Sequence, residues 1–542
     1  MDLSLSRSQM RMNGSPQNST IFDSEAPSLP LPTTSARGVK PGALVDVDLH
    51  KDHPSAKPSA AHAQKLDWVD GLRGFACWQV ANSHCLGQLL NGVEWHVSTL
   101  IQPFPNSPAT LSPTQEVLAG HNSVMLFFIL SGRVLLNGFL KRRDPSYVAS
   151  GAFRRPLRLG LPIYAGLLLH IFFTRIGVYH INTFASDKLQ AYGVSNWFKY
   201  PEDMDIHHPA MQSVGGFLWS VPRMFLYHQL VPYPNRVQWT LPYEMEQSYY
   251  LFALVIFASF IGSRRWIFYF LATFMSWWMT TWSYPFFVGL IIADAAVSGH
   301  LTSIRSSRAW RYLHPFLLTF TASLWILSSM PEVNTELKRL ENTLLHSWLP
   351  DPDWNAGGNI GFYDSSQLPF WKPDNVIFIH ALTVILSIET TPVLQAVFST
   401  RPMLFLGKIS YMLYLFHPLF HATVPSLVMY LTIDYLPYSV AIVLAYLVNM
   451  AVIIPFSWLM YELFDMPSVR AAKWIVDKLF KDPWGFHAFA GCVRAAIALP
   501  KRVVRAAPVA VLRVLVAFPI VLLRAGRVLV ARWTAKAGYA GL

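Results

Sequence analysis

Residues 70–84 read DGLRGFACWQVANSH, an apolar stretch that begins with Asp70 and Arg73 and carries His84 inside it. At about 100° per residue, these three side chains fall within one narrow stripe of an α-helix. A charge at the centre of a bilayer costs roughly 3 kcal/mol or more, so such residues face a bundle interior or a polar cavity. The stretch therefore predicts a membrane helix whose polar stripe faces a single site inside the helix bundle. A helix-end ion pair beside an ordinary packing histidine also fits these residues.

The composition of the whole chain is that of a membrane protein. Of its 542 residues, 53% are hydrophobic and 14% are charged, whereas a soluble protein carries about 25% charged residues. Cys77, Cys85 and Cys492 show neither a disulfide framework nor metal-ligand spacing, so we expect no metal and no bound cofactor. The net charge of +12 is typical of a multi-spanning protein whose basic residues set its topology and contact anionic lipid. We therefore expect membrane lipid, and no nucleic acid, as a partner.

Apolar runs that reach the roughly 20 residues needed to cross a bilayer recur along the chain. The predicted fold class is all-α: a polytopic membrane protein with about ten transmembrane helices, a disordered N-terminal extension and a basic amphipathic C-terminal tail. The predicted segments are 68–90, 122–140, 157–176, 243–262, 265–282, 284–299, 311–330, 376–394, 403–430 and 438–463. The Trp-rich stretch 214–231 is broken by glycine and proline, and we expect it at the membrane interface.

Lysine and arginine gather in the short loops on one predicted side of the membrane, and cytoplasmic loops are enriched in these residues. They follow the second, fourth, sixth and eighth segments: Lys141, Arg142, Arg143, Arg154, Arg155, Arg158, Arg264, Arg265, Arg305, Arg308, Arg311 and Arg401. The long loop 331–375 carries seven Asp or Glu residues and belongs to the opposite side. We therefore expect a multi-pass integral membrane protein with both termini in the cytoplasm.

The two ends of the chain differ from the membrane region. Residues 1–63 are rich in Ser, Pro, Asn and Thr, which predicts a disordered extension. Residues 466–542 carry thirteen Lys or Arg against two Asp, a net charge of +11. Within them RVVRAAPVAVL (502–512) and RVLVAFPIVLL (513–523) repeat every eleven residues, about three helical turns. We expect a kinked basic amphipathic helix on the cytoplasmic leaflet, and a tail without set structure stays possible.

The motif WTLPYEMEQSYY (239–250) places polar side chains at the start of the fourth segment. Glu244 and Ser248 are four residues apart, on one helical face, shortly after Trp239. In GKISYMLYLFHPLF (407–420), Ser410 and His417 are seven apart, two helical turns, so they also share a face. Helix packing is the more common role of a lone Ser such as Ser410.

The stretch FFILSGRVLLNGFLKRRD (127–144) carries Ser131 and Gly132, which allow close helix approach. Arg133 follows them as a second intramembrane charge. The basic group RRPLR (154–158) comes next, at the predicted cytoplasmic mouth. These residues predict a positively charged region at the cytoplasmic end of the bundle.

Five stretches, taken in order, resemble the signature of the acyltransferase-3 family of integral-membrane acyltransferases: DGLRGFACWQVANSH, FFILSGRVLL, RRPLRLGLPIY, WTLPYEMEQSYY and SYMLYLFHP. The variant WTLPYExxxS is similar to the branch found in filamentous fungi. The resemblance covers roughly residues 66–465 and implies a transmembrane acyltransferase domain over 64–465, between the extension 1–63 and the tail 466–542. From residues 466–542 we expect no GDS-type hydrolase domain of the kind fused to many relatives.

The resemblance also implies roles for single residues. His84 would be the catalytic histidine and Arg73 its essential partner, with Glu244 and His417 as the other catalytic residues lining the same site. Substrate or donor binding is implied or expected for Asp70, Ser131, Arg133, Arg154, Arg155, Arg158, Trp239, Ser248 and Ser410. The family often has an aliphatic or aromatic residue where this chain has Arg133. That departure predicts either an extra phosphate contact or an altered substrate.

The chemistry of acyl transfer fits these residue types independently. A histidine with a pKa near 6.5 can take the proton of an attacking hydroxyl, and arginine can hold the phosphates of a thioester donor in bidentate form. We therefore predict a membrane O-acyltransferase that uses acyl-CoA as co-substrate and acylates a hydroxyl of a sugar, lipid or secondary metabolite. Since no Ser or Cys has a local nucleophile motif, direct transfer is favoured over an acyl-enzyme.

The competing hypothesis is a polytopic transporter or proton-coupled permease, because intramembrane charges also mark ion pathways. Many carriers are built from internal repeats, and the two halves of this chain show no repeat of charge or hydropathy. A receptor or scaffold would leave the polar stripe of residues 70–84 unexplained. The acyltransferase hypothesis is therefore preferred.

Overall fold

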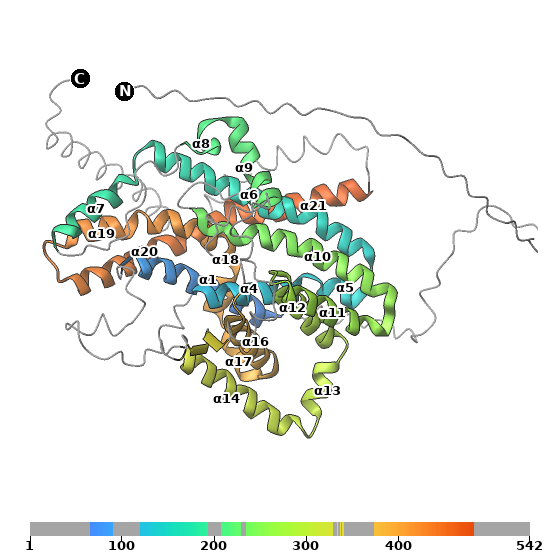
Figure 1. The fold of residues 1–542 in the computed structure, drawn as a ribbon. Coiled ribbons are helices and arrows are strands. Elements are labelled where there is room, and N and C mark those ends of the chain that lie inside the picture. Colours follow the sequence, from blue (N-terminus) through green and yellow to red (C-terminus); the bar gives the residue numbers. More distant parts are fainter. Residues whose placement is uncertain are drawn as a thin grey trace, which may run out of the picture. The chain divides into compact units, whose positions relative to one another are not determined.

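The computed structural model of the protein describes residues 66–89, 120–192, 207–228, 235–328 and 373–481, with five positions between 333 and 340 (Figure 1). Contacts divide the chain into Met1–Gln64 and Lys65–Leu542, and all described residues lie in the second unit. The described part of the chain is helical without strands, which confirms the all-α class. The predicted extension 1–63 and the repeat at 502–523 lie outside it.

Every predicted segment coincides with helical structure. The corresponding helices are α1 (Asp67–Leu89), α4 (Gly120–Leu135) with α5 (Asn137–Arg142), α6 (Pro145–Arg175), α10 (Thr240–Ile261), α11 (Arg265–Trp278), α12 (Ser283–Val297), α14 (Trp310–Ser328), α16 (Asn375–Thr390), α18 (Arg401–His421) with α19 (Val424–Thr432), and α20 (Tyr438–Met460). Between and after them lie α7 (His180–Ala191), α8 (Pro209–Gln212), α9 (Val214–Tyr227), η1 (Asn235–Trp239), η2 (Gly262–Arg264), α13 (His300–Ser306), α17 (Pro392–Phe398), the π-helical turn η5 (Tyr461–Asp465) and α21 (Met466–Lys481).

The helices support an integral membrane protein. Among the described residues, five helical stretches are long and apolar enough to cross a membrane, or seven if each of two bent pairs is one span. One stretch, Val237–Trp278, has 42 residues. That is about 63 Å of helix, roughly twice the hydrocarbon core of a bilayer. Gly262, at φ 66°, interrupts this stretch between α10 and α11. The count of ten spans stays a prediction.

Helix α1 packs along α18, and the two lie side by side (Figure 1). A Cβ added to Gly74 would collide with the backbone at Gly407, so the two helices touch backbone to backbone. One turn further along, the Cys77 thiol donates a hydrogen bond to the Ser410 carbonyl, at 2.9 Å between Sγ and O. Because residue numbers rise together along both helices, α1 and α18 run in the same direction.

Helix α4 packs between α1 and α12. Its contact with α12 is again made through glycine: a Cβ on Gly132 would meet the backbone of Phe286, and one on Gly289 would meet the backbone of Ile129. The expectation that Gly132 allows close helix approach is thus confirmed. On the other side, Ser123 Oγ donates to Gln79 Oε1 of α1 at 2.9 Å. These crossings form the part of the bundle that surrounds α1.

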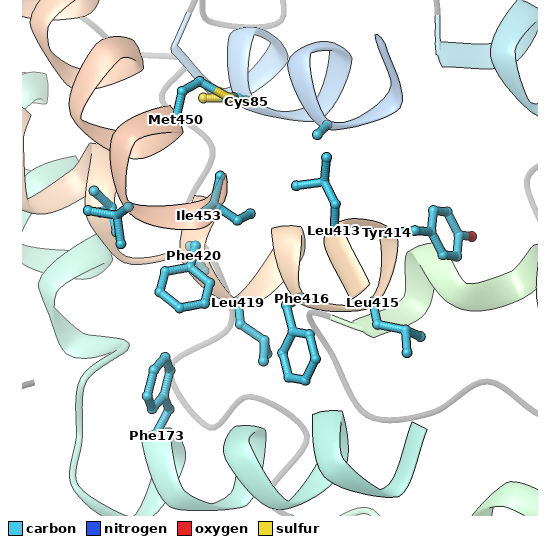
Figure 2. Close-up of a cluster of buried hydrophobic side chains, with 14 of the residues drawn as sticks. Cys85, Phe173, Leu413, Tyr414, Leu415, Phe416, Leu419, Phe420, Met450 and Ile453 are labelled. Carbon is cyan, nitrogen blue, oxygen red and sulfur yellow. The ribbon is translucent and has the colours of Figure 1, made fainter. Parts of the chain in front are cut away.

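The other face of α18 packs in a cluster of buried apolar side chains (Figure 2). Phe416 and Phe420 of α18 point toward α6, and the ring centroids of Phe420 and Phe173 are 6.2 Å apart. Met450 and Ile453 of α20 belong to the same cluster. Lipid tails are as apolar as these side chains, so close packing rather than exclusion of water stabilises the contact. Helix α18 is therefore held on several sides.

Helix α20 continues through η5 into α21, so the predicted domain boundary at residue 465 falls inside one helical run. Helix α21 packs on α6, with Ala472 and Val476 buried. The first sixteen residues of the predicted tail, Met466–Lys481, are thus packed against the helix that carries RRPLR.

A methyl group at the α1–α18 crossing should loosen the bundle. We expect Gly407→Ala to lower the midpoint of thermal unfolding, because its Cβ would collide with the Asp70 backbone. Overpacking of this kind costs about 1–3 kcal/mol. The matched control is Gly166→Ala in α6, whose Cβ would meet no atom within 4 Å. Thermal unfolding of both variants in one detergent measures the difference, and equal midpoints would show that the crossing has room.

The topology can be tested with tags at the N-terminus, at position 350 and at the C-terminus. Position 350 follows the seventh predicted segment and lies outside the described residues. It should therefore be on the side of the membrane opposite to both termini. Protease protection in sealed vesicles reports the side of each tag. Access to all three tags from one side would contradict the ten-span count and the assignment of the loops.

Candidate active site

A cavity of about 340 Å³ opens between α1, α4, α6, α10, α18 and η5. Its size is that of a small-molecule site. The charged residues that line it are Arg73, Arg155, Arg158, Lys408, Glu244 and Asp465. Four cations against two carboxylates give the lining a positive balance. Ser131 and Ser410 also line the cavity, beside apolar side chains such as Phe127 and Leu130. The arrangement suits an anionic ligand that also has an apolar part.

Glu244 and Arg155 form an ion pair at one wall of this cavity. Ser131 Oγ donates a hydrogen bond to Glu244 Oε1 at 2.9 Å. Arg155 Nη2 also donates to the Glu244 carbonyl at 3.3 Å, and Ser248 donates to the same carbonyl. Residues from α4, α6 and α10 are thereby joined, and the guanidinium of Arg155 is fixed in place.

Arg73 enters the same cavity from α1. Its Nη2 lies 3.1 Å from Asp70 Oδ1 and donates to the Gly407 carbonyl at 3.1 Å. The side chain is 36% exposed, and within the described residues its Nε has no hydrogen-bond partner. The structure thus brings Asp70 and Arg73 together as expected from their spacing. Arg73 keeps a donor available for a ligand.

The two predicted histidines meet farther along the same helix pair. The rings of His84 and His417 stack with centroids 5.3 Å apart. His417 Nδ1 lies 3.2 Å from the Leu413 carbonyl, which can only accept a hydrogen bond. In the neutral ring, Nδ1 therefore carries the proton and Nε2 presents a lone pair. That Nε2 is buried and, within the described part of the chain, has no hydrogen-bond partner. His417 is thus prepared to accept a proton or a hydrogen bond.

A third histidine, His421, extends this group, and its ring centroid is 5.3 Å from that of His417. Asn449 Nδ2 donates to His421 Nδ1 at 2.9 Å, so the proton of the neutral ring lies on Nε2 and is donated to the Ala81 carbonyl at 2.9 Å. The sequence interpretation missed His421. Its position one helical turn after His417 was the available signal.

Tyr414 contacts both the cavity and the histidines. It lines the cavity, and its ring centroid lies 5.8 Å from that of His417. Its hydroxyl is hydrogen-bonded to Thr240 Oγ1, with 2.7 Å between the oxygens, and to the Val237 carbonyl. Neither His84 nor His417 lines the cavity itself. Ser410, Tyr414 and His417 instead form one stripe of α18 that leads from the cavity to the histidine pair.

A family model described as an acyltransferase domain matches residues 66–462. The chain belongs to this acyltransferase family. A curated relative, the O-acetyltransferase PaAT-1 of Phomopsis amygdali, is 25% identical over 467 residues, which cover 76% of this chain and 85% of that protein. No solved structure matches the chain significantly. The protein is therefore an acyl-transferring enzyme, as predicted, and the transporter hypothesis is set aside.

One predicted donor-binding residue of this acyltransferase has an internal partner instead. Arg133 is 2% exposed and does not line the cavity. Its Nε and Nη2 donate to the two carboxylate oxygens of Glu389, at 3.0 and 2.9 Å, and its Nη1 donates to Asn137 at 3.0 Å. The guanidinium joins α4 to α16, which leaves the predicted phosphate contact without structural support.

Four other predicted donor-binding residues also lie away from the cavity lining, and one of them is Asp70, the ion-pair partner of Arg73. Arg154 Nε donates to the Ser150 carbonyl, one turn earlier in α6, at 3.1 Å. Trp239 packs against Trp282, with ring centroids 5.5 Å apart. Ser248 contacts only the backbone of Glu244 among the hydrogen bonds of the described residues. The predicted residues that do line the cavity are Arg73, Arg155, Arg158, Glu244, Ser131 and Ser410.

The pairing of Arg133 with Glu389 predicts a double-mutant result. Arg133→Met should strongly lower thermal stability, because removal of one partner leaves a buried carboxylate uncompensated at a cost of about 3–5 kcal/mol. Arg133→Met with Glu389→Met should recover most of that loss. Thermal unfolding in detergent provides the measurement. If Arg133→Met kept its stability and lost only donor binding, Arg133 would be a ligand contact after all.

Proposed function

We propose that this acyltransferase moves an acyl group from acyl-CoA to a hydroxyl of a sugar, lipid or secondary metabolite. One observation carries the proposal: a single helix pair, α1 with α18, holds both the cationic cavity residue Arg73 and the stacked histidines His84 and His417. Thioester-to-hydroxyl transfer needs both elements, a positive site for the donor and a base for the acceptor.

The donor is assigned to the cavity. Arg155 and Arg158 are three residues apart on α6, and both line it together with Arg73. A coenzyme A thioester carries phosphates, which guanidinium groups bind in bidentate form. The apolar lining, including Phe127 and Leu130, provides a wall for the uncharged part of the donor. Glu244 holds Arg155 in this arrangement, so we assign it a positioning role.

The reaction is assigned to the histidine pair. His84 is exposed and stacks on the buried ring of His417. We assign His84 to take the proton from the acceptor hydroxyl as its oxygen attacks the thioester carbonyl. A C–O bond forms, the C–S bond breaks, and the thiolate of coenzyme A leaves and recovers the proton from the imidazolium. His417 presents an unprotonated Nε2 beside this ring. We assign this lone pair to stabilise the positive charge that His84 gains with the proton.

Direct transfer is favoured by the state of the two described cysteines. Cys77 and Cys85 are fully buried. The Cys77 thiol donates to the Ser410 carbonyl, and the Cys85 sulfur accepts from Asn449 at 3.3 Å. Neither thiol is placed as an activated nucleophile, which needs an adjacent base or a lowered pKa. An acetyl group is the first acyl group to test, because the curated relative is an O-acetyltransferase.

Substitution of His84 and Arg73 should separate turnover from donor binding. We expect His84→Ala to lower turnover about 100-fold or more, the usual share of general base catalysis, with acetyl-CoA binding nearly unchanged. Arg73→Lys should weaken donor binding, because lysine lacks the planar fork of arginine. The matched control is Arg142→Lys, an exposed arginine that does not line the cavity. Calorimetric binding and turnover would be measured on each purified variant.

Two results would count against the proposal. Equal loss of donor binding in His84→Ala would show that the histidine belongs to the donor site. Normal turnover in that variant would remove the proposed mechanism, whatever the effect of Arg73→Lys.

A further inference from the structure

Asp465 lines the cavity from η5, the π-helical turn between α20 and α21. A π turn inserts one extra residue into a helix and is frequent at functional sites. This turn is anchored to its surroundings. Ser468 Oγ donates to the Asp465 carbonyl at 2.8 Å, and Glu462 pairs with Lys408 of α18 at 3.0 Å. These contacts fix the backbone on both sides of Asp465, which lies in the wall of the cavity.

This carboxylate has an acceptor that the described part of the chain leaves unused. Asp465 is 7% exposed, and its Oδ1 is buried without a hydrogen-bond partner. Buried polar atoms are almost always hydrogen-bonded, and an unmatched one calls for an explanation. Since Asp465 lines a cavity, a ligand in that cavity can supply the missing hydrogen-bond donor.

The arginines of the cavity do not supply it. Arg73 is paired with Asp70, and Arg155 is paired with Glu244. Within the described residues, no ion pair or hydrogen bond joins the Asp465 side chain to either arginine or to Arg158. Asp465 thus lines the cavity together with these cations without being bound to them. Its charge also makes it a poor neighbour for a phosphate.

We propose that Asp465 binds the acyl donor by accepting a hydrogen bond from a neutral N–H or O–H group of that ligand, while the arginines hold its phosphates. The assignment rests on the proposed acyl-CoA donor and adds a residue to its site. A coenzyme A thioester carries amide and hydroxyl groups next to its phosphates, so it can satisfy both kinds of partner. An inorganic polyphosphate anion has no such neutral group, and the site would select against it.

A simple counter-charge would behave in the opposite way. If Asp465 only balanced the arginines, its neutralisation would leave the cavity more positive and would tighten binding of every polyanion. If Asp465 accepts a hydrogen bond from the donor, neutralisation removes a charged acceptor from that ligand alone. The two roles thus predict opposite changes in the affinity for acetyl-CoA when Asp465 is neutralised. For pyrophosphate, both roles allow the affinity to rise.

The test compares Asp465→Asn and Asp465→Leu with the unaltered full-length protein in one detergent. Calorimetry measures binding of acetyl-CoA and of inorganic pyrophosphate to each. We expect both variants to bind acetyl-CoA about tenfold more weakly, the loss expected for a hydrogen bond to a charged acceptor. Pyrophosphate should bind equally well or more tightly, which also shows that the cavity is still folded. The matched control is Asp477→Asn, which removes a negative charge about three helical turns later in α21, outside the cavity lining.

Each other outcome is decisive. Tighter binding of acetyl-CoA by Asp465→Asn and Asp465→Leu would overturn the assignment and make Asp465 a counter-charge. A loss of acetyl-CoA binding in Asp477→Asn as large as in the Asp465 variants would also overturn it. Failure of the unaltered protein to bind acetyl-CoA would instead overturn the proposed donor, and this assignment with it.

Discussion

The close crossing of α1 with α18 determines where the remaining site residues can lie. Gly74 and Gly407 have no side chains, so the two backbones meet there, and any Cβ would force them apart. Because the helices run in the same direction, residues ten positions beyond each glycine also meet. Those residues are His84 and His417, whose rings stack at 5.3 Å. At the glycines themselves, Arg73 donates to the Gly407 carbonyl and reaches the cavity.

The charged residues inside the bundle fall into two groups. Arg133 with Glu389 and Arg265 with Asp294 are bound in bidentate pairs that join helices. Such pairs remove the cost of an isolated charge in an apolar environment. The second group keeps an unused polar atom in the described structure: Arg73 Nε, Arg155 Nε, Asp465 Oδ1 and His417 Nε2. The first three residues line the cavity and His417 stacks on His84, so substrates would complete their contacts there.

Periodicity predicted much of this arrangement. The stripe of Asp70, Arg73 and His84 could be read from the sequence because α1 is one regular helix, and the stripe of Ser410 and His417 follows from the same rule. Local spacing could not predict the partner of Arg133, since Glu389 is 256 residues away in the chain. It could not predict Asp465 either, because a π turn shifts the phase of the helix by one residue. The family motifs named Arg154 and Arg155 together, and only the three-dimensional structure separates them.

The most direct test is a cryo-electron microscopy structure of the protein with a non-transferable acetyl-CoA analogue bound. The phosphates should contact Arg73, Arg155 and Arg158, and the acyl group should extend past Tyr414 toward His84 and His417. An analogue bound with its phosphates outside this cavity, or with its acyl group directed away from the histidine pair, would contradict the account.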